Sequence, residues 1–194
     1  MNIDIPEHIS LAFLFKGEVK EEKNNARKII KKMLEEKGVE VHETELQRSP
    51  LYEFNDYQLS LSHSRGSVVG ALALKSDYTY LGVDLETLER KNDLLKLERK
   101  ILTREEKKIF DSLEGISLSD YILLVFSIKE SLYKAYSREK DLILRFDETS
   151  LKELDLKKKT FTYELKKKTK EVFILNQGVF AMEDGLLLTL VFSS

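Results

Sequence analysis

Residues 126–135 read FSIKESLYKA and lie within an uninterrupted helical pattern that runs from about residue 119 to residue 136. At about 100° per residue, one face of this helix is apolar. The opposite face carries Ser127, Glu130 and Lys134. Glu130 precedes Lys134 by four residues, so the two charged ends can meet on the helix surface. Taken alone, this spacing indicates an ordinary solvated helix face, but features upstream in the chain favour a different interpretation.

The composition is that of a heavily charged globular protein. The chain has 194 residues, of which 42% are hydrophobic and 34% charged, and its net charge is −2. This length allows one domain or two small halves with a core, and the net charge argues against a nucleic-acid partner. Because cysteine is absent, disulfides, zinc–thiolate sites and cysteine nucleophiles are excluded. Neither a signal-peptide pattern nor an apolar stretch of membrane-spanning length is found, so we expect a cytoplasmic protein without a membrane partner.

Strand and helix patterns occur twice in a similar order. The first series is a strand at 8–16, a basic helix at 19–37 ended by Gly38, and an antiparallel meander at 57–62, 67–75 and 78–86. The second series is a charged, mostly helical region at 87–118 with a capping box at 103–106, the helix at 119–136, and strands at 142–146, 160–165, 172–182 and 186–192. This order predicts an α+β fold, a single globular unit of two similar halves, 1–100 and 101–194.

Two acids, Asp84 and Glu86, lie two residues apart in the strand pattern LGVDLE of residues 81–86. Strand alternation directs both side chains to the same face. Two like charges side by side are unfavourable in apolar surroundings unless a positive charge lies between them, and hard oxygen ligands of this kind suit Mg²⁺. The alternative is a strand end that runs out into solvent, where acids are common.

A third feature is the strand end Ser62-His63-Ser64, which is followed by a turn at Gly66. It offers backbone N–H groups, the Ser62 hydroxyl and a His63 N–H to an anion. The alternative is a structural histidine at a turn. The sequence contains neither a GxxxxGK[ST] nor a GxGxxG phosphate loop, and it lacks the HExxH zinc motif and the GxSxG nucleophile elbow.

The three stretches together, SHS at 62–64, GVDLE at 82–86 and FSIKESLYKA at 126–135, resemble the 4′-phosphopantetheinyl transferases of the type that activates siderophore and surfactin synthetases. That family has the pattern S-H-[SC], then G-[IV]-D-x-E, then [FW]-S-x-K-E-[SA]-x-x-K. The last two motifs match at every fixed position. A fainter likeness aligns Arg48 with an R-x-P-x-[WY] segment of the enterobactin branch, and Arg27 with an arginine of that branch.

This resemblance implies a pseudo-twofold α+β fold in which each half is a small antiparallel sheet packed with a long helix, with the site at their junction. It implies coenzyme A as the donor substrate and a serine of an apo acyl or peptidyl carrier protein as the acceptor. The product released would be adenosine 3′,5′-bisphosphate. Asp84, Glu86 and Glu130 would hold Mg²⁺ on the diphosphate of coenzyme A.

The resemblance also implies the remaining roles. Glu130 and Lys134 would be catalytic, with Glu130 as the base for the serine hydroxyl and a metal-bound hydroxide as the alternative base. The residues expected to bind the donor are Arg27, Arg48, Ser62, His63, Asp84, Lys129 and Lys134.

Two rival functions use the same residues. One is a catalytically silent homologue that binds a carrier protein or a nucleotide, and the other is a Mg²⁺-dependent phosphohydrolase. The lysines at 157–159 and 166–170 either meet an acidic carrier protein or protect an edge strand from aggregation. With two halves in one chain, we expect a monomer.

Overall fold

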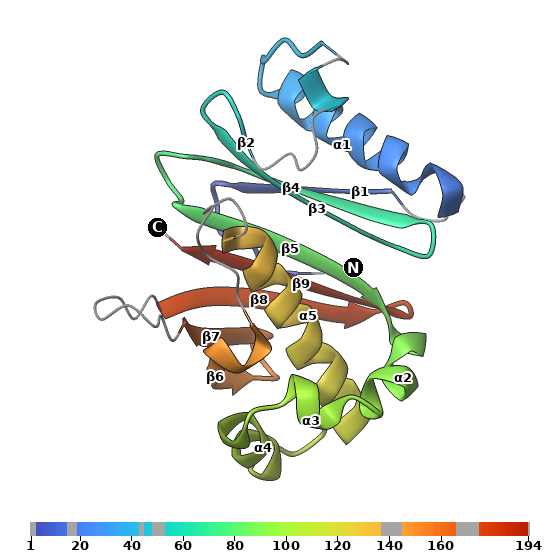
Figure 1. Cartoon of the computed structure of the whole chain (residues 1–194). Helices are drawn as coiled ribbons and strands as arrows, with labels where there is room; N and C mark the ends of the chain where they lie inside the picture. Colours follow the sequence, from blue (N-terminus) through green and yellow to red (C-terminus); the bar gives the residue numbers. More distant parts are fainter. Residues whose placement is uncertain are drawn as a thin grey trace.

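The computed structural model describes residues 3–14, 19–42, 45–47, 53–136, 145–165 and 175–193. These ranges form two antiparallel sheets and two long helices, with short helices between them (Figure 1). The strands are β1 (Ile9–Leu14), β2 (Glu53–Phe54), β3 (Tyr57–Ser64), β4 (Ser67–Leu74), β5 (Tyr80–Thr87), β6 (Thr149–Asp155), β7 (Thr160–Leu165), β8 (Leu175–Glu183) and β9 (Leu186–Ser193). The helices are η1 (Val19–Glu21), α1 (Glu22–Glu36), η2 (Glu45–Gln47), η3 (Leu88–Arg90), α2 (Lys91–Leu95), α3 (Glu98–Ile101), α4 (Arg104–Asp111), α5 (Leu118–Tyr136) and η4 (Phe146–Glu148).

The two sheets share one topology. In the first sheet the strand order is β1–β4–β3–β2, and α1 comes between β1 and β2 in the chain. In the second sheet the order is β5–β9–β8–β7–β6, and α5 comes between β5 and β6. In each, the first strand pairs antiparallel with the last, and the remaining strands form a meander. The expected α+β fold, with a small antiparallel sheet and one long helix in each half, is confirmed.

The elements stack as helix, sheet, sheet and helix, with α1 and α5 on the outer sides (Figure 1). The helix α1 buries Ile30, Met33 and Leu34 against Leu59 and Leu72 of the first sheet. The facing sheets enclose a second cluster, which includes Val69, Ala71, Val83, Leu85 and Leu190. The helix α5 covers the other face of the second sheet and buries Ile128 and Leu132 against Phe161, Leu187 and Val191. Burial of these side chains, at roughly 1.5–3 kcal/mol each, is the main force that holds the layers together.

One predicted pairing is wrong. Residues 78–86 were expected to complete a meander with 57–62 and 67–75, but β5 pairs with β9, with Asp84 opposite Thr189. On its other edge, the backbone N–H groups of Val83 and Leu85 donate to the hydroxyls of Ser60 and Ser62 on β3, at 2.9 and 3.1 Å. Serine side chains therefore satisfy the edge of β5 that faces the first sheet. The division of the chain at residue 100 stays a prediction, although β5 precedes it and belongs to the second sheet.

The sequence predicted both helix ends described here correctly, but it did not predict the first strand that follows α5. The capping box at Thr103 and Glu106 opens α4 as predicted, and Gly38 ends α1 with a positive φ of 76° and a hydrogen bond from its N–H to the Glu35 carbonyl. The strand predicted at 142–146 is wrong in its described part, because Phe146 begins the 3-10 helix η4. The strand β6, which follows η4, was not predicted.

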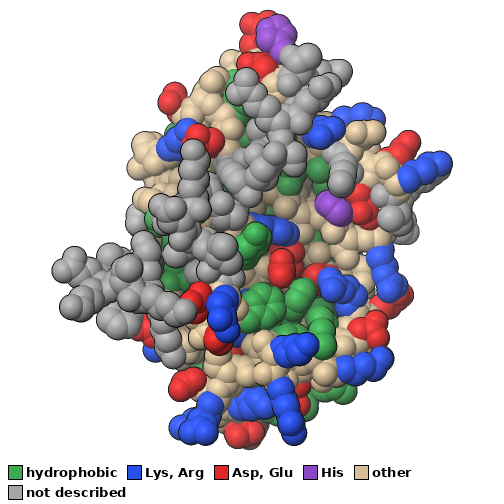
Figure 2. Space-filling view, in the orientation of Figure 1, with side chains coloured by type: hydrophobic (Ala, Val, Ile, Leu, Met, Phe, Trp, Pro, Cys, Tyr) green, Lys and Arg blue, Asp and Glu red, His purple; other side chains and the backbone are tan. Residues whose placement is uncertain are grey.

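Basic and acidic side chains are interspersed over the face of the molecule drawn in Figure 2. Within the described ranges, no helix is long and apolar enough to cross a membrane.

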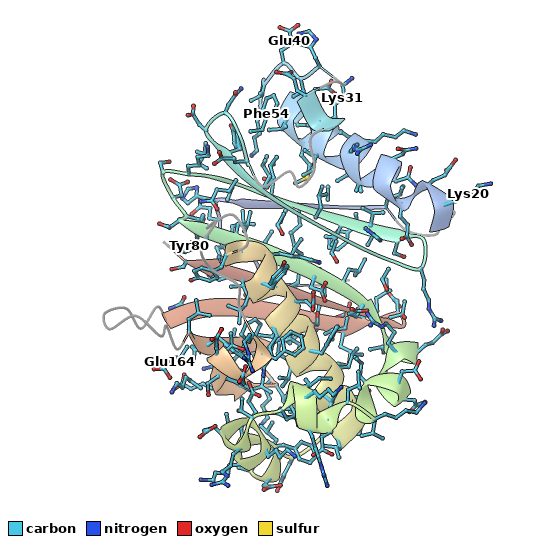
Figure 3. The ribbon with its side chains drawn as sticks, in the orientation of Figure 1. Lys20, Lys31, Glu40, Phe54, Tyr80 and Glu164 are labelled. Atoms are coloured by element: carbon cyan, nitrogen blue, oxygen red, sulfur yellow. The ribbon has the colours of Figure 1, made fainter. Side chains whose placement is uncertain are left out.

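Gly82 allows α5 to lie directly on β5. A Cβ atom at this position would stand 2.0 Å from the Ser131 carbonyl oxygen and 2.8 Å from the Ala135 nitrogen. Any side chain would therefore collide with the helix backbone. Close to this contact, Tyr80 of β5 packs against Tyr136 of α5 with ring centroids 4.1 Å apart, and Figure 3 labels Tyr80 at this position. The two contacts fix how α5 crosses the strand that carries Asp84.

Replacing Gly82 with alanine is expected to destabilise the protein by about 3 kcal/mol or more, at the upper end of overpacking effects, because the helix backbone cannot step aside. Urea unfolding followed by circular dichroism measures this free energy. Gly70→Ala on β4 is the matched control, because the three atoms nearest to its Cβ all belong to side chains, those of Ile29, Met33 and Ile30, at 3.0, 3.2 and 3.3 Å. If Gly82→Ala were no more destabilising than Gly70→Ala, the backbone contact would not be the constraint we describe.

Candidate active site

Asp84 is the centre of a buried polar group between β5, β3 and α5. Its side chain faces α5, and the residue is only 4% exposed. One carboxylate oxygen accepts hydrogen bonds from Ser62 Oγ at 3.0 Å and from Lys134 Nζ at 2.7 Å, while the other accepts from Ser127 Oγ at 2.8 Å. The Lys134 ammonium also donates to Ser62 Oγ at 2.7 Å. The first half of the chain thus supplies Ser62, and the second half supplies Ser127 and Lys134.

A second set of hydroxyl contacts fixes the rotation of α5 above this group. Ser127 Oγ and Ser131 Oγ both contact Thr189 Oγ1 on β9, at 2.9 and 2.6 Å, and all three residues are fully buried. Because Thr189 lies opposite Asp84 in the strand pairing, the same network joins α5 to both β5 and β9. A helix rotated by one residue would lose these bonds, since its hydroxyls would face other partners.

Glu86 lies one strand repeat beyond Asp84 and is also buried, at 5% exposure. Arg90 of η3 donates to one oxygen of its carboxylate and packs over the Phe126 ring, 5.2 Å from the centroid. The other oxygen, Oε2, is buried and has no hydrogen-bond partner among the described residues. Such an atom is costly unless a ligand completes its coordination. Burial, followed by the charge of Asp84, raises the pKa of Glu86, and Arg90 opposes that shift.

Glu130 belongs to the same electrostatic group. It is half-buried on α5, and its pKa is raised by burial and then by Asp84, while Lys134 and Arg90 lower it. Glu86, Glu130 and Lys134 therefore each interact with Asp84, whereas their role as a metal and substrate site stays a prediction. The sequence suggested an ion pair between Glu130 and Lys134 on the helix surface. In the structure, the Lys134 ammonium instead donates to Asp84 and Ser62.

The carboxylate oxygens of this group supply part of the ligand set that a hard cation needs. The carboxylates of Asp84 and Glu86 share one face of β5, and one buried oxygen of Glu86 lacks a partner. In the described part of the chain, no three histidine, aspartate or glutamate side chains are already close enough to enclose a metal ion. Mg²⁺ commonly takes only one or two protein carboxylates and fills its shell with water and substrate phosphates. Asp84 and Glu86, with Glu130 nearby, are thus the residues that could hold such an ion.

His63 is not drawn into the Asp84 group. Side chains 62 and 63 of β3 point to opposite faces of the strand, so Ser62 meets Asp84 while His63 faces the α1 side. There, His63 Nδ1 lies 2.6 Å from a carboxylate oxygen of Glu22. Arg27 is half-buried on α1, and Arg48, with the segment that carries it, lies outside the described residues. The structure thus supports Ser62 as part of the group more directly than Arg27 or His63.

The prediction that Lys129 binds the donor is wrong. Instead of facing the acids on β5, its ammonium is buried on another side of α5, where it donates to the Ile101 carbonyl at 2.6 Å, to the Phe146 carbonyl at 2.9 Å and to Glu106 Oε2 at 2.9 Å. Burial lowers the pKa of Lys129, and Glu106 opposes the shift. With all three of its donors engaged, Lys129 is not available to a phosphate.

Glu106 completes this second buried group. It is fully buried, receives the hydroxyl hydrogen bond of Tyr163 and backbone N–H bonds from Thr103 and Leu151, and pairs with Lys129. The sequence identified Glu106 only as half of a capping box. Its second role could not be found from the sequence, because the contact depends on how α4 packs beside α5.

Several residues of the candidate site were not predicted. Arg90 follows Glu86 by four residues, but it stands beyond the strand, where no pattern marked it. Thr189 is defined only by the pairing of β5 with β9, and Glu22 only by the packing of α1 beside the β3–β4 turn.

The family model described as ACPS, the 4′-phosphopantetheinyl transferase superfamily, matches residues 80–190. This range covers more than half of the chain and includes β5, α5 and the first part of β9, so the chain belongs to that superfamily. No curated protein matches the chain.

Two solved structures are similar over part of the chain. A holo-(acyl-carrier-protein) synthase from Bacillus anthracis, in complex with CoA (3′,5′-ADP), is 21% identical, covers 60% of this chain and 98% of its own, and has a TM-score of 0.45. A holo-ACP synthase from Plasmodium yoelii is 19% identical, covers 59% of this chain and 93% of its own, and has a TM-score of 0.46.

Replacing Lys129 with methionine is expected to destabilise the protein by about 3–5 kcal/mol, because the Glu106 carboxylate then remains buried without its cation. The double variant Lys129→Met with Glu106→Gln removes both charges and is expected to recover at least half of that loss. Urea unfolding measures both, and Lys32→Met, at an exposed ion pair on α1, is the control. A single variant as stable as the wild type would show that the pair does not hold α5.

The raised pKa of Glu130 makes a prediction about stability without added metal. A carboxyl with a higher pKa in the folded state binds protons more tightly there, so stability falls as the pH rises from the ordinary glutamate pKa of 4.5 through the raised value. Glu130→Gln is therefore expected to raise the melting temperature at pH 7 in the presence of a chelator. Calorimetry tests this, with Glu36→Gln on the exposed side of α1 as the control. A lower melting temperature for Glu130→Gln would contradict the assignment.

Proposed function

We propose that this chain is an active 4′-phosphopantetheinyl transferase. It transfers the 4′-phosphopantetheine arm of coenzyme A to a serine of an apo acyl or peptidyl carrier protein and releases adenosine 3′,5′-bisphosphate. The observation that carries the proposal is the buried group of Asp84, Glu86 and Lys134, which lies within the residues matched to the superfamily. It combines acidic oxygens, one of them unpartnered, with an ammonium at the junction of the two halves.

Asp84, Glu86 and Glu130 would hold Mg²⁺. When bound, this ion neutralises charge on the phosphate oxygens and helps to orient the diphosphate. Asp84 and Ser62 hold the Lys134 ammonium in place, and its positive charge would stabilise a phosphate bound beside the group. Displacement at phosphorus depends mainly on such positioning and on neutralising charge as it develops.

Glu130 is the proposed base. Its carboxylate accepts the proton of the carrier serine as the serine oxygen bonds to the phosphorus that carries pantetheine. The bond from that phosphorus to the bridging oxygen breaks, and both bonding electrons leave with adenosine 3′,5′-bisphosphate. In the metal-free protein, burial and then the charge of Asp84 raise the pKa of Glu130.

The finer assignments belong to the same proposal. The motifs favour the type of transferase that activates siderophore and surfactin synthetases, in a cytoplasmic monomer. A monomer fits the sheet topology, in which one chain carries both sheets. Of the lysines considered for carrier docking, those at 166–170 lie outside the described residues.

The decisive experiment is mass spectrometry of several apo carrier proteins after incubation with the chain, coenzyme A and Mg²⁺. We expect a mass increase of one phosphopantetheine arm on at least one carrier. Asp84→Asn is expected to lower kcat/KM by at least about 100-fold, the effect of losing one charge-stabilising group in an active site. Asp93→Asn, in an exposed ion pair on α2, should retain wild-type activity.

The rival functions give different results in the same assay. A silent homologue would bind the carrier or the nucleotide but modify no carrier that a known transferase modifies. A phosphohydrolase would release phosphate from coenzyme A without any carrier. Either result would overturn the proposed function.

A further inference from the structure

Glu22, the first residue of α1, joins three parts of the first half. Its carboxylate accepts a hydrogen bond from the backbone N–H of Gly66 in the β3–β4 turn, and its other oxygen lies 2.6 Å from His63 Nδ1. The Glu22 side chain is 9% exposed, whereas that of His63 is 44% exposed. A buried carboxylate thus holds an imidazole whose other side is open to solvent.

This arrangement decides which nitrogen of His63 can meet a ligand. Because Nδ1–H donates to Glu22, the ring orientation is fixed, and among the described residues Nε2 has no partner. In the imidazolium form Nε2–H is a donor, and the Glu22 carboxylate balances the positive charge. An anion is the ligand that such a nitrogen would bind.

His63 also stands next to the candidate active site along the chain. Its neighbour Ser62 contacts Asp84 and Lys134 on the opposite face of β3. The turn that follows is tied to η3, the segment directly after β5, because Arg65 pairs with Glu89. The end of β3 is therefore held on one face by the contact of His63 with Glu22, and on the other face by the contacts of Ser62 with Asp84 and Lys134.

We propose that Glu22 is a positioning residue: it orients His63 so that Nε2 faces a phosphate of the nucleotide part of coenzyme A. This inference rests on the proposed function for the identity of the ligand. Glu22 itself does not touch the substrate, and its effect passes through His63. A competing explanation is that Glu22 only braces the β3–β4 turn through Gly66.

A double-mutant cycle separates the two explanations. Glu22→Gln is expected to raise KM for coenzyme A about tenfold, a coupling typical of residues in direct contact, with kcat changed by less than about twofold. In a His63→Ala background, the same substitution should change KM by less than about twofold, because the residue through which Glu22 acts is already gone. Glu21→Gln, an exposed neighbour outside this contact, is the control. Equal effects of Glu22→Gln in both backgrounds would overturn the proposal in favour of a brace.

Two readouts do not depend on turnover. Nitrogen-15 NMR of the histidines should show the proton of His63 on Nδ1 in the free protein, and Glu22→Ala, which leaves no side-chain acceptor, should abolish that signature. Calorimetry with adenosine 3′,5′-bisphosphate should show weaker binding to Glu22→Gln than to Glu21→Gln. If no carrier is modified but both readouts behave as expected, the proposed function fails and Glu22 still orients His63 toward a nucleotide. If the NMR signature or the difference in binding is absent, the positioning role fails whatever the activity.

Discussion

The backbone contact between α5 and β5 at Gly82 is the constraint on which the candidate site depends. With no side chain at this position, the helix can approach the strand until the Ser131 carbonyl nearly touches it. Asp84 and Glu86 follow Gly82 on the same face of β5, so they point toward the helix at the next two repeats. Ser127, one helical turn before Ser131, then reaches Asp84. A wider spacing between helix and strand would separate the carboxylates from Lys134, which lies next to the contact.

Two buried polar groups fix α5 from different sides. Toward the sheet, Ser127 and Ser131 share Thr189, and away from it Lys129 pairs with Glu106. Buried charges of this kind are weak contributors to stability when compared with well-packed apolar side chains. Their contribution here is to fix the rotation of α5 about its axis. Because α5 is buried on nearly every side, a contrast between an apolar and a solvent-exposed face cannot determine that rotation. Glu130, between Lys129 and Ser131 in sequence, is half-buried and interacts with the charge of Asp84.

The sequence predicted structural features that depend on neighbouring residues, such as helix ends and the face of a strand. It did not predict contacts between segments that are distant in the chain. The capping box at Thr103, the glycine end of α1 and the shared face of Asp84 and Glu86 follow from local geometry, and all are found. The pairing of β5 with β9 joins strands about a hundred residues apart, and nothing in the residues 78–86 excludes the meander that was expected instead. Lys129 was assigned to the donor site because the resemblance to the family motif implied it, but one residue turns a helix by about 100°, so Lys129 and Glu130 face different sides. The position of Lys129 in the sequence could not show that its partner would be Glu106.

The charges around Asp84 explain why the group would suit a cation together with an anionic substrate. Among the described residues of this group, Asp84, Glu86 and Glu130 carry three negative charges, whereas Lys134 and Arg90 carry two positive ones. One negative charge is left in partly buried surroundings, where it is poorly solvated, and the pKa of both glutamates rises in response. On the proposed function, a divalent ion would reverse the net charge to one positive unit. The same group would then attract a diphosphate, so that binding of the metal prepares the site for the donor.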